Sequence, residues 1–361
     1  MQDRTDGAMA IAHEWISARA GSEKVFEALA ATYPEADLYA LTRTPGVDLE
    51  TGGRPVRTTF LDRLGPIRDR RGLTLPLMPL AWRNAGGGRR YDTVVTSSHA
   101  CVKGFRPARD ARQHCYVHAP MRYVWSPDID ARGGHSMLAP ARAALRRWDL
   151  GSVRWVDSFA ANSRTVADRV GRYYDREAVV IPPPVDTGFF AAAPRPERKS
   201  GLVAVGRMIP YKGFDRAIAI AAELEQPLTI VGRGPDESRI RALAAASSAP
   251  VDVVTGASDE QLRAHVAAAA VLLFPTIEDF GIVPVESQAA GTPVVGPALG
   301  GLLDTVVDGV TGHLAPTNEH EDLVEATRRA LSVELSGQAC RDHAETFGAA
   351  YFERRVRTWV G

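Results

Sequence analysis

The feature that most constrains the fold is an alternation of strand and helix patterns that occurs on both sides of a proline-rich segment. In the second half, LVAVGR is followed by FDRAIAIAAEL, PLTIVG by DESRIRALAAA, and VDVVTG by DEQLRAHVAAA. Apolar runs of this kind are typical of strands covered on both faces, and their alternation with helices predicts a parallel sheet. Residues 182–201, PPPVDTGFFAAAPRPERKSG, cannot continue a helix or a central strand, so they are predicted to link two domains.

The first half shows a similar alternation. Three strand candidates and one helix candidate stand out: residues 8–15, 91–98, 113–120 and 21–34. The 361 residues are therefore predicted to form an α/β protein of two doubly wound, Rossmann-like domains, residues 1–183 and 184–340. Residues 341–361 are predicted to form a C-terminal helix that packs on either domain, with a return to the first domain as one option.

Composition narrows the function classes. Lysine plus arginine and aspartate plus glutamate both number 43, so the net charge does not support a nucleic-acid partner. The three cysteines are scattered without metal-ligand spacing, which favours a reducing compartment. No run reaches the roughly 18 apolar residues of a membrane span, and charged residues interrupt any signal-peptide core near the N-terminus. We expect a cytoplasmic protein without a metal site.

The first site candidates lie directly after strands of the second domain, because such sheets bind ligands at the carboxyl ends of their strands. Arg207 and Lys212 follow the first strand, where two cations suit an anion such as a diphosphate; ordinary surface charge is the equal alternative. Gly232, in VGRGPD, indicates a tight turn, and a structural turn is favoured over a nucleotide that lies across it. Ser258 and Gln261 fit a capping box, which explains them structurally.

The stretch EDFGIVPVESQAAG, residues 278–291, places two carboxylates between a strand and a helix. Pro284 suits the first turn of that helix. The helix N-terminus is expected to attract an anion through the backbone N–H groups of Phe280, Gly281, Ile282 and Val283. Glu278 lies in the loop and Glu286 in the first turn, where compensation of the helix dipole is the alternative explanation for Glu286.

The first domain offers comparable positions. Gly21 and Ser22 begin a helix directly after a strand, which gives a second helix N-terminus suited to an anion. His118 follows a strand and precedes Pro120, so a place in the site and a structural role are about equally supported. His99 is a weaker example of the same placement.

Residues 63–90 interleave seven arginines with leucines, Met78 and Trp82, against one acid, Asp69. Helices with a solvated basic face are the favoured explanation. A surface that meets anionic lipid or a phosphorylated acceptor is the second.

Together these motifs resemble those of the retaining glycosyltransferases of family 4, whose GT-B fold has two Rossmann-like domains facing across a cleft. The resemblance covers nearly the whole chain through motifs that follow in order: HEWISARAGSEKV, SSHACVKG, CYVHAPMRYVW, PPPVDT, VGRMIPYKG, VGRGPD and FPTIEDFGIVPVESQAAGTPVV. Ala20 departs from the pattern, since the family commonly has the first glycine of a pair there. The branch it most resembles is the bacterial mannosyltransferases that use GDP-mannose.

The resemblance implies that the second domain binds the nucleotide sugar. Arg207 and Lys212 would neutralise the donor diphosphate. Glu278 would hydrogen-bond sugar hydroxyls with help from the backbone of residues 280–283, and Glu286 would accept from the ribose hydroxyls. Gly232 would belong to the donor site as well.

For the first domain, the resemblance implies acceptor binding, with His118 in contact with the transferred sugar and Gly21 near the phosphate. The implied reaction moves a hexosyl unit, with mannose from GDP-mannose as first choice, to a hydroxyl of a glycan, glycolipid or metabolite, with retention and without a metal or other cofactor. A UDP-sugar donor is the alternative. A sugar-nucleotide epimerase and a non-catalytic sensor of the same fold are disfavoured by Arg207, Lys212 and Glu278.

Overall fold

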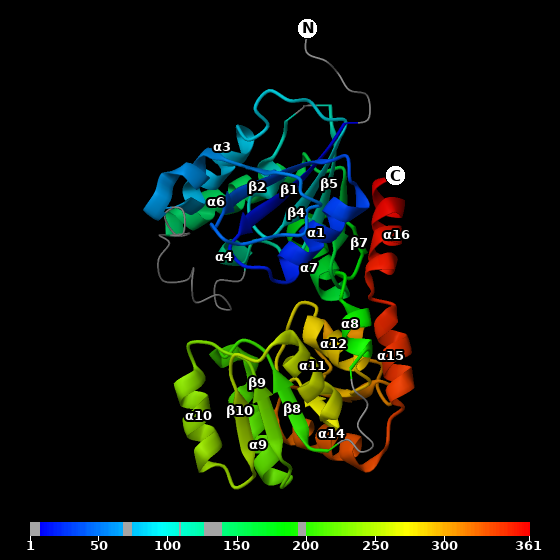
Figure 1. The fold of residues 1–361 in the computed structure, drawn as a ribbon. Coiled ribbons are helices and arrows are strands. Elements are labelled where there is room, and N and C mark those ends of the chain that lie inside the picture. Colours follow the sequence, from blue (N-terminus) through cyan, green and yellow to red (C-terminus); the bar gives the residue numbers. More distant parts are fainter. Residues whose placement is uncertain (1–7, 68–73, 108–109, 126–138, 194–199) are drawn as a thin grey trace. The chain divides into compact units, whose positions relative to one another are not determined.

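The computed structural model describes residues 8–67, 74–107, 110–125, 139–193 and 200–361 (Figure 1). Their contacts form two compact units, Met1–Pro184 with Phe352–Gly361, and Val185–Tyr351. Each unit is built around its own parallel sheet. The predicted α/β class with two Rossmann-like domains is therefore confirmed.

The first unit has a seven-stranded sheet in the order β3-β2-β1-β4-β5-β6-β7. The strands are β1 Met9–Ile16, β2 Asp37–Arg43, β3 Val56–Thr58, β4 Thr93–Ser98, β5 Arg112–Val117, β6 Ser158–Ala161 and β7 Ala178–Val180. The helices are α1 Gly21–Thr32, α3 Met78–Arg83, α4 Arg122–Trp125, α6 Ala139–Val153 and α7 Arg164–Tyr174, with 3-10 turns η1 Phe60–Ile67, η2 Leu75–Leu77 and η3 Val102–Gly104.

Alternate residues of β1 show that both faces of this sheet are covered. Ile11 packs in one cluster with residues of α1, whereas Ala10 and Ala12 pack in another with residues of α3. Because successive side chains of a strand point to opposite faces, the two clusters lie on opposite sides of the sheet.

The second unit has a six-stranded sheet in the order β10-β9-β8-β11-β12-β13. The strands are β8 Leu202–Val205, β9 Leu228–Val231, β10 Val251–Val254, β11 Val271–Leu273, β12 Val294–Pro297 and β13 Gly312–Ala315. The helices are α8 Thr187–Ala191, α9 Phe214–Glu223, α10 Glu237–Ala246, α11 Asp259–Ala268, α12 Ile282–Ala289, α13 Leu302–Thr305, α14 His320–Ser332, α15 Gly337–Glu345 and the start of α16 Ala349–Val360, with the 3-10 turn η4 Pro210–Lys212.

Two predicted segments differ in detail. The predicted linker contains α8, because Asp186 accepts from the N–H of Phe189 and caps a short helix after the prolines. The C-terminal segment is not a single helix: α15 and α16 are separate. Within the first unit, Phe352 and Val356 of α16 share a buried cluster with α1 residues. None of the helices in the described part of the chain combines the length and apolarity that crossing a bilayer requires.

Candidate functional site

In the second unit, the cationic loop after β8 is held in place by a glycine. Arg207 is exposed, whereas Lys212 is partly buried, with its ammonium 5.8 Å from the ring centre of Phe274. Directly after Lys212, Gly213 has a φ of 70°, and a Cβ there would lie 2.5 Å from the carbonyl oxygen of Pro275. Only glycine fits this close approach, so the position from which the Lys212 side chain leaves the backbone is fixed.

Lys212 forms an ion pair with Glu278, which lies in the loop after β11. The carbonyl of Glu278 accepts from the N–H of Gly301 at 2.8 Å, so the segment after β12 holds this loop. Burial lowers the pKa of Lys212 to about 8, and the neighbouring carboxylate favours the charged form, so the ammonium is a cation at neutral pH. Two of the predicted site residues, one cation and one anion, thus come together at the strand ends of one sheet.

The predicted helix after this loop is confirmed as α12, and Pro284, its third residue, lies in the first turn as predicted. Gly281 is its N-cap with a φ of 88°, and its backbone N–H groups are not capped by a side chain. Because Ile282 is the first helical residue, Glu286 is the fifth and lies beyond the first turn, so its predicted place in that turn is wrong. Compensation of the helix dipole, which weakens past the first turn, therefore explains Glu286 poorly.

The four predicted amide donors lie at this N-terminus. Phe280 and Gly281 are buried, and Ile282 and Val283 are partly buried. The ring of Phe280 packs edge-on against Phe347, with ring centres 5.8 Å apart. The turn is therefore anchored by packing.

Gly232 allows two strand-end loops to touch. A Cβ at Gly232 would lie 1.9 Å from the carbonyl oxygen of Gly206, which no larger residue permits. The same two loops are joined by a hydrogen bond from the N–H of Met208 to the carbonyl of Arg233 at 2.9 Å. Gly232 thus has a clear packing role next to the Arg207 loop.

In the first unit, three histidines gather at the carboxyl ends of β1, β4 and β5. The ring centre of His13 lies 5.8 Å from that of His99 and 6.2 Å from that of His118, and the ring centres of His99 and His118 are 6.1 Å apart. Ser97 lies between two of them, with its Oγ 3.0 Å from Nδ1 of His13 and 2.7 Å from Nε2 of His118. Burial lowers the pKa of both His13 and His118 to about 3, so both rings are neutral at pH 7.

Gly21 is the first residue of α1, as predicted, and follows the loop after β1. The N-cap residue Ala20 has extended backbone and offers no side-chain hydrogen bond to the helix. In the described part of the chain, no group of three or more His, Cys, Asp or Glu side chains is arranged to hold a metal ion.

A buried carboxylate holds the loop that carries His99. Glu14, the β1 neighbour of His13, accepts from the N–H groups of Ala100 and Val102, both at 2.8 Å. Burial raises the pKa of Glu14 to about 7, although these hydrogen bonds oppose the shift.

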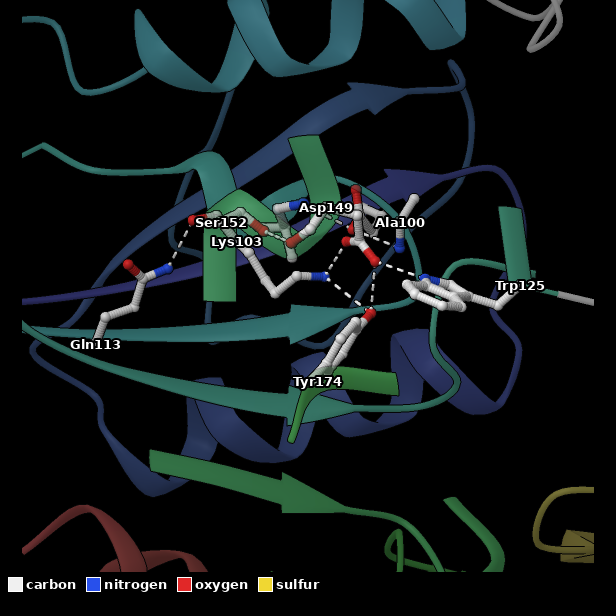
Figure 2. Close-up of polar contacts among 9 residues, drawn as sticks. Ala100, Lys103, Gln113, Trp125, Asp149, Ser152 and Tyr174 are labelled. Atoms are coloured by element: carbon white, nitrogen blue, oxygen red, sulfur yellow. Dashed lines mark hydrogen bonds and ion pairs between the residues drawn. The ribbon is translucent and has the colours of Figure 1, made fainter. Parts of the chain in front are cut away.

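The same loop is fixed by a buried ion pair (Figure 2). Nζ of Lys103 lies 2.8 Å from Oδ1 of Asp149, and Oδ2 of Asp149 accepts from Tyr174 and Trp125, both at 2.8 Å. Burial alone would lower the pKa of Lys103, but the Asp149 carboxylate raises it well above its usual value. Asp149 therefore joins the loop after β4 to α4 and α7.

Five of these residues were not predicted from the sequence: His13, Glu14, Ser97, Lys103 and Asp149. A signal exists for some of them. His13 and Glu14 are polar residues inside an apolar strand, and Lys103 is one of few lysines, set in the apolar run ACVKGF. Ser97 begins SSHACVKG, one of the motifs on which the resemblance rests, whereas Asp149 has no comparable signal.

Of the basic segment 63–90, residues 68–73 lie outside the described residues. The remainder includes the end of η1, then η2 and α3, followed by a turn; Met78 and Trp82 are buried, whereas Leu77 and Leu80 are 39% and 49% exposed. Arg89 pairs with Asp37 at 2.6 Å.

Two family models match the chain one after the other. The model described as Glycosyltransferase Family 4 matches residues 20–189, and the model described as Glycosyl transferases group 1 matches residues 187–347. The chain belongs to the family 4 glycosyltransferases.

Two curated relatives of this family 4 chain are named as transferases. A GDP-mannose-dependent alpha-(1-6)-phosphatidylinositol monomannoside mannosyltransferase of Mycolicibacterium smegmatis is 34% identical over 239 residues, 57% of this chain and 62% of the relative. A D-inositol 3-phosphate glycosyltransferase of Acidothermus cellulolyticus is 34% identical over 215 residues, 52% of this chain and 48% of the relative. The chain thus spans 62% and 48% of the lengths of these two relatives.

Solved structures agree on the fold. A sucrose-phosphate synthase from Thermosynechococcus elongatus has a TM-score of 0.76 at 20% identity, over 96% of this chain and 98% of its own. Anabaena HepE in complex with UDP has a TM-score of 0.70 at 17% identity, over 97% and 99%. The family 4 chain therefore has the GT-B architecture of two Rossmann-like domains.

Proposed function

We propose that the protein is a glycosyltransferase that moves a hexosyl unit from a nucleotide sugar to a hydroxyl acceptor with retention. The observation that carries the proposal is the pairing of Lys212 with Glu278 beside the N-terminus of α12, at the strand ends of the second unit of a family 4 chain. A cation, a carboxylate and a helix N-terminus without a side-chain cap are the groups that a sugar diphosphate needs.

The chemistry follows from the charges that develop. When the bond between sugar and phosphate breaks, the leaving diphosphate gains negative charge, which Lys212 and Arg207 stabilise together with the amides of residues 281–283. The sugar gains positive charge, which the carboxylate of Glu278 stabilises while it accepts from sugar hydroxyls. No metal or other cofactor is needed for these steps in our proposal.

A mechanism with two catalytic carboxylates is disfavoured. Glu286 lies on α12 beyond its first turn, and in this proposal it takes the role that the family resemblance implies, accepting from the ribose hydroxyls. Glu278 is then the carboxylate that this proposal assigns to the sugar, whereas paired-carboxylate hydrolysis requires two that flank the bond.

We propose GDP-mannose as the donor, since one relative is named as GDP-mannose-dependent. Anabaena HepE, which shares the fold, was solved in complex with UDP, so a UDP-sugar is the alternative. The acceptor is a hydroxyl of a glycan, a glycolipid or a small metabolite.

Part of the first unit suits an anionic membrane surface in this proposal. Leu77, Leu80 and Arg83 of the segment 63–90 are all exposed. Leucines that insert and arginines that meet headgroups are the usual features of such a surface. Sedimentation with vesicles that contain anionic phospholipid tests this: the wild type should co-sediment more than Leu77→Ser/Leu80→Ser, and equal sedimentation contradicts it.

A panel of GDP- and UDP-sugars tests the donor. Each sugar nucleotide is added to the protein at one concentration, and the unfolding temperature and the release of nucleoside diphosphate are measured. A bound donor raises the unfolding temperature by mass action, and GDP-mannose should raise it most. A clear preference for a UDP-sugar overturns the choice of donor, and a lack of binding and turnover with every sugar nucleotide overturns the proposed function.

A further inference from the structure

A continuous hydrogen-bond chain links a buried histidine to the predicted site histidine. The sheet register places His13 of β1 opposite Ser97 of β4, and Ser97 opposite Tyr116 of β5. His118 lies two residues after Tyr116, so all three members of the chain face the same side of the sheet. Distances of 3.0 and 2.7 Å join them through the single hydroxyl of Ser97.

One hydroxyl hydrogen couples the two rings. Ser97 donates to one histidine nitrogen and accepts from the other, so the chain has two possible directions. In the first, Nδ1 of His13 carries a hydrogen and Nε2 of His118 accepts. In the second, Nε2 of His118 carries the hydrogen, which forces the hydrogen of His13 onto its own Nε2.

The surroundings of His13 decide between the two directions. His13 is fully buried, and its ring stacks on Phe26 at 5.3 Å with an interplanar angle of 26°. Nε2 of His13 has no hydrogen-bond partner among the described residues. A buried N–H without a partner is rarer in folded proteins than an acceptor without one, so Nε2 of His13 is the nitrogen that lacks hydrogen.

We propose that His13 and Ser97 are positioning residues that hold His118 in the tautomer with hydrogen on Nδ1, so that His118 presents an N–H donor to an oxygen of the bound substrate. Nε2 of His118 accepts from Ser97, which leaves Nδ1 as the nitrogen that can reach a ligand. That this ligand is a sugar nucleotide rests on the proposed function, whereas the tautomer does not.

The backbone around His118 supports a fixed donor direction. The carbonyl of His118 accepts from Nδ2 of Asn162 at 3.0 Å, and its N–H donates to the carbonyl of Ser98 at 2.9 Å. Its neutral ring would donate a hydrogen bond to a sugar oxygen in both the ground state and the transition state. It would not serve as a general base, since burial lowers its pKa to about 3.

Nitrogen NMR of the full chain with ¹⁵N-labelled histidine tests the tautomer directly, because protonated and unprotonated ring nitrogens have well-separated chemical shifts. In the wild type, we expect the ring hydrogen of His118 on Nδ1. Ser97→Ala should give a mixture of tautomers, and Ser98→Ala, the adjacent buried serine whose side chain points to the other face, should give the wild-type spectrum. A hydrogen on Nε2 of His118 in the wild type, or a spectrum that Ser97→Ala leaves unchanged, overturns the proposal.

Turnover of the donor then tests the role. Ser97→Ala should raise the KM for the donor about tenfold with kcat little changed, because the weakened hydrogen bond is made in both the ground state and the transition state, and Ser98→Ala should stay within about twofold of wild type in both constants. His118→Asn, whose amide can place an N–H where Nδ1 was, should retain more activity than His118→Gln. An equal donor KM for Ser97→Ala and wild type overturns the positioning role. If the tautomer is as expected but the wild type transfers no sugar, the proposed function fails and the tautomer assignment stands.

Discussion

The candidate residues of the two units lie at the same kind of sheet edge, but those of the first unit are neutral and those of the second are charged. In the first unit, His13 and His118 are neutral and joined by hydrogen bonds within the protein. In the second, Lys212 and Glu278 are charged and lie on loops shaped by glycines. Neutral, preorganised groups suit recognition of hydroxyls, whereas charges that a ligand can separate suit a diphosphate.

The largest effect should come from breaking the buried ion pair between Lys103 and Asp149 in the first unit. Asp149→Ala leaves the Lys103 ammonium buried without a counter-ion, and should destabilise the first unit by about 3–5 kcal/mol. Hydrogen exchange measured peptide by peptide reports each unit separately. Exchange should increase in the first unit and stay unchanged in the second.

Asp168→Ala is the matched control for this change, because Asp168 is an exposed carboxylate on α7 of the same unit. It should alter stability by less than about 0.5 kcal/mol. Similar exchange for both variants would mean that the Lys103–Asp149 pair does not hold this unit together.

A smaller effect is expected from a substitution of Lys212 in the second unit. Lys212→Ala removes the cation assigned to the diphosphate and should lower kcat by about 10²–10³-fold, the usual loss for one group that stabilises developing negative charge. Arg328→Ala, an exposed cation paired with Glu325 in the same unit, should leave turnover unchanged. Equal activity of Lys212→Ala and wild type would remove Lys212 from the site.

In the first unit, the contribution of Glu14 to stability should depend on pH in the opposite sense to the contributions of His13 and His118. The pKa of Glu14 is about 7 in the folded protein and 4.5 as its ordinary value, so its contribution to stability is fully present below pH 4.5 and is lost as pH rises to 7. The pKa values of His13 and His118 are about 3 against 6.5, so their contribution is present above pH 6.5 and is lost as pH falls toward 3.

Glu14→Gln isolates the contribution of the Glu14 carboxyl to the free energy of unfolding. The free energy of unfolding of the wild type minus that of Glu14→Gln should fall between pH 4.5 and 7, as measured by urea unfolding followed in the first unit. A difference that is constant over this range would contradict the raised pKa of Glu14.

Much of this architecture is readable from the sequence, because apolar runs such as LVAVGR mark buried parallel strands and the residues after them mark the sheet edge. Lys212 and Glu278 were both predicted in this way, and the structure adds that they form an ion pair. Glu286 shows a limit of the method, since Pro284 lies in the first turn as predicted but does not fix which residue begins the helix. Contacts that depend on strand register could not be predicted from the sequence, because they join distant residues; His13 and Ser97, for example, are 84 positions apart.

Strand β3, Val56–Thr58, shows the same limit at the level of the fold. Three residues carry no periodicity, and the strand is defined by pairing with β2. The buried pair of Lys103 and Asp149 likewise depends on how α6 packs on the loop after β4, which local patterns do not encode.

The central claim is that Glu278 binds the sugar while Lys212 binds the diphosphate, and Glu278→Gln tests it most directly. Calorimetric titration with GDP and with GDP-mannose compares ligands that differ by the sugar. Because the variant frees Lys212 from its ion pair, GDP should bind about threefold more tightly. Because it weakens hydrogen bonds to sugar hydroxyls, GDP-mannose should bind about tenfold more weakly. Equal weakening of both ligands, or no change in either, would contradict the account.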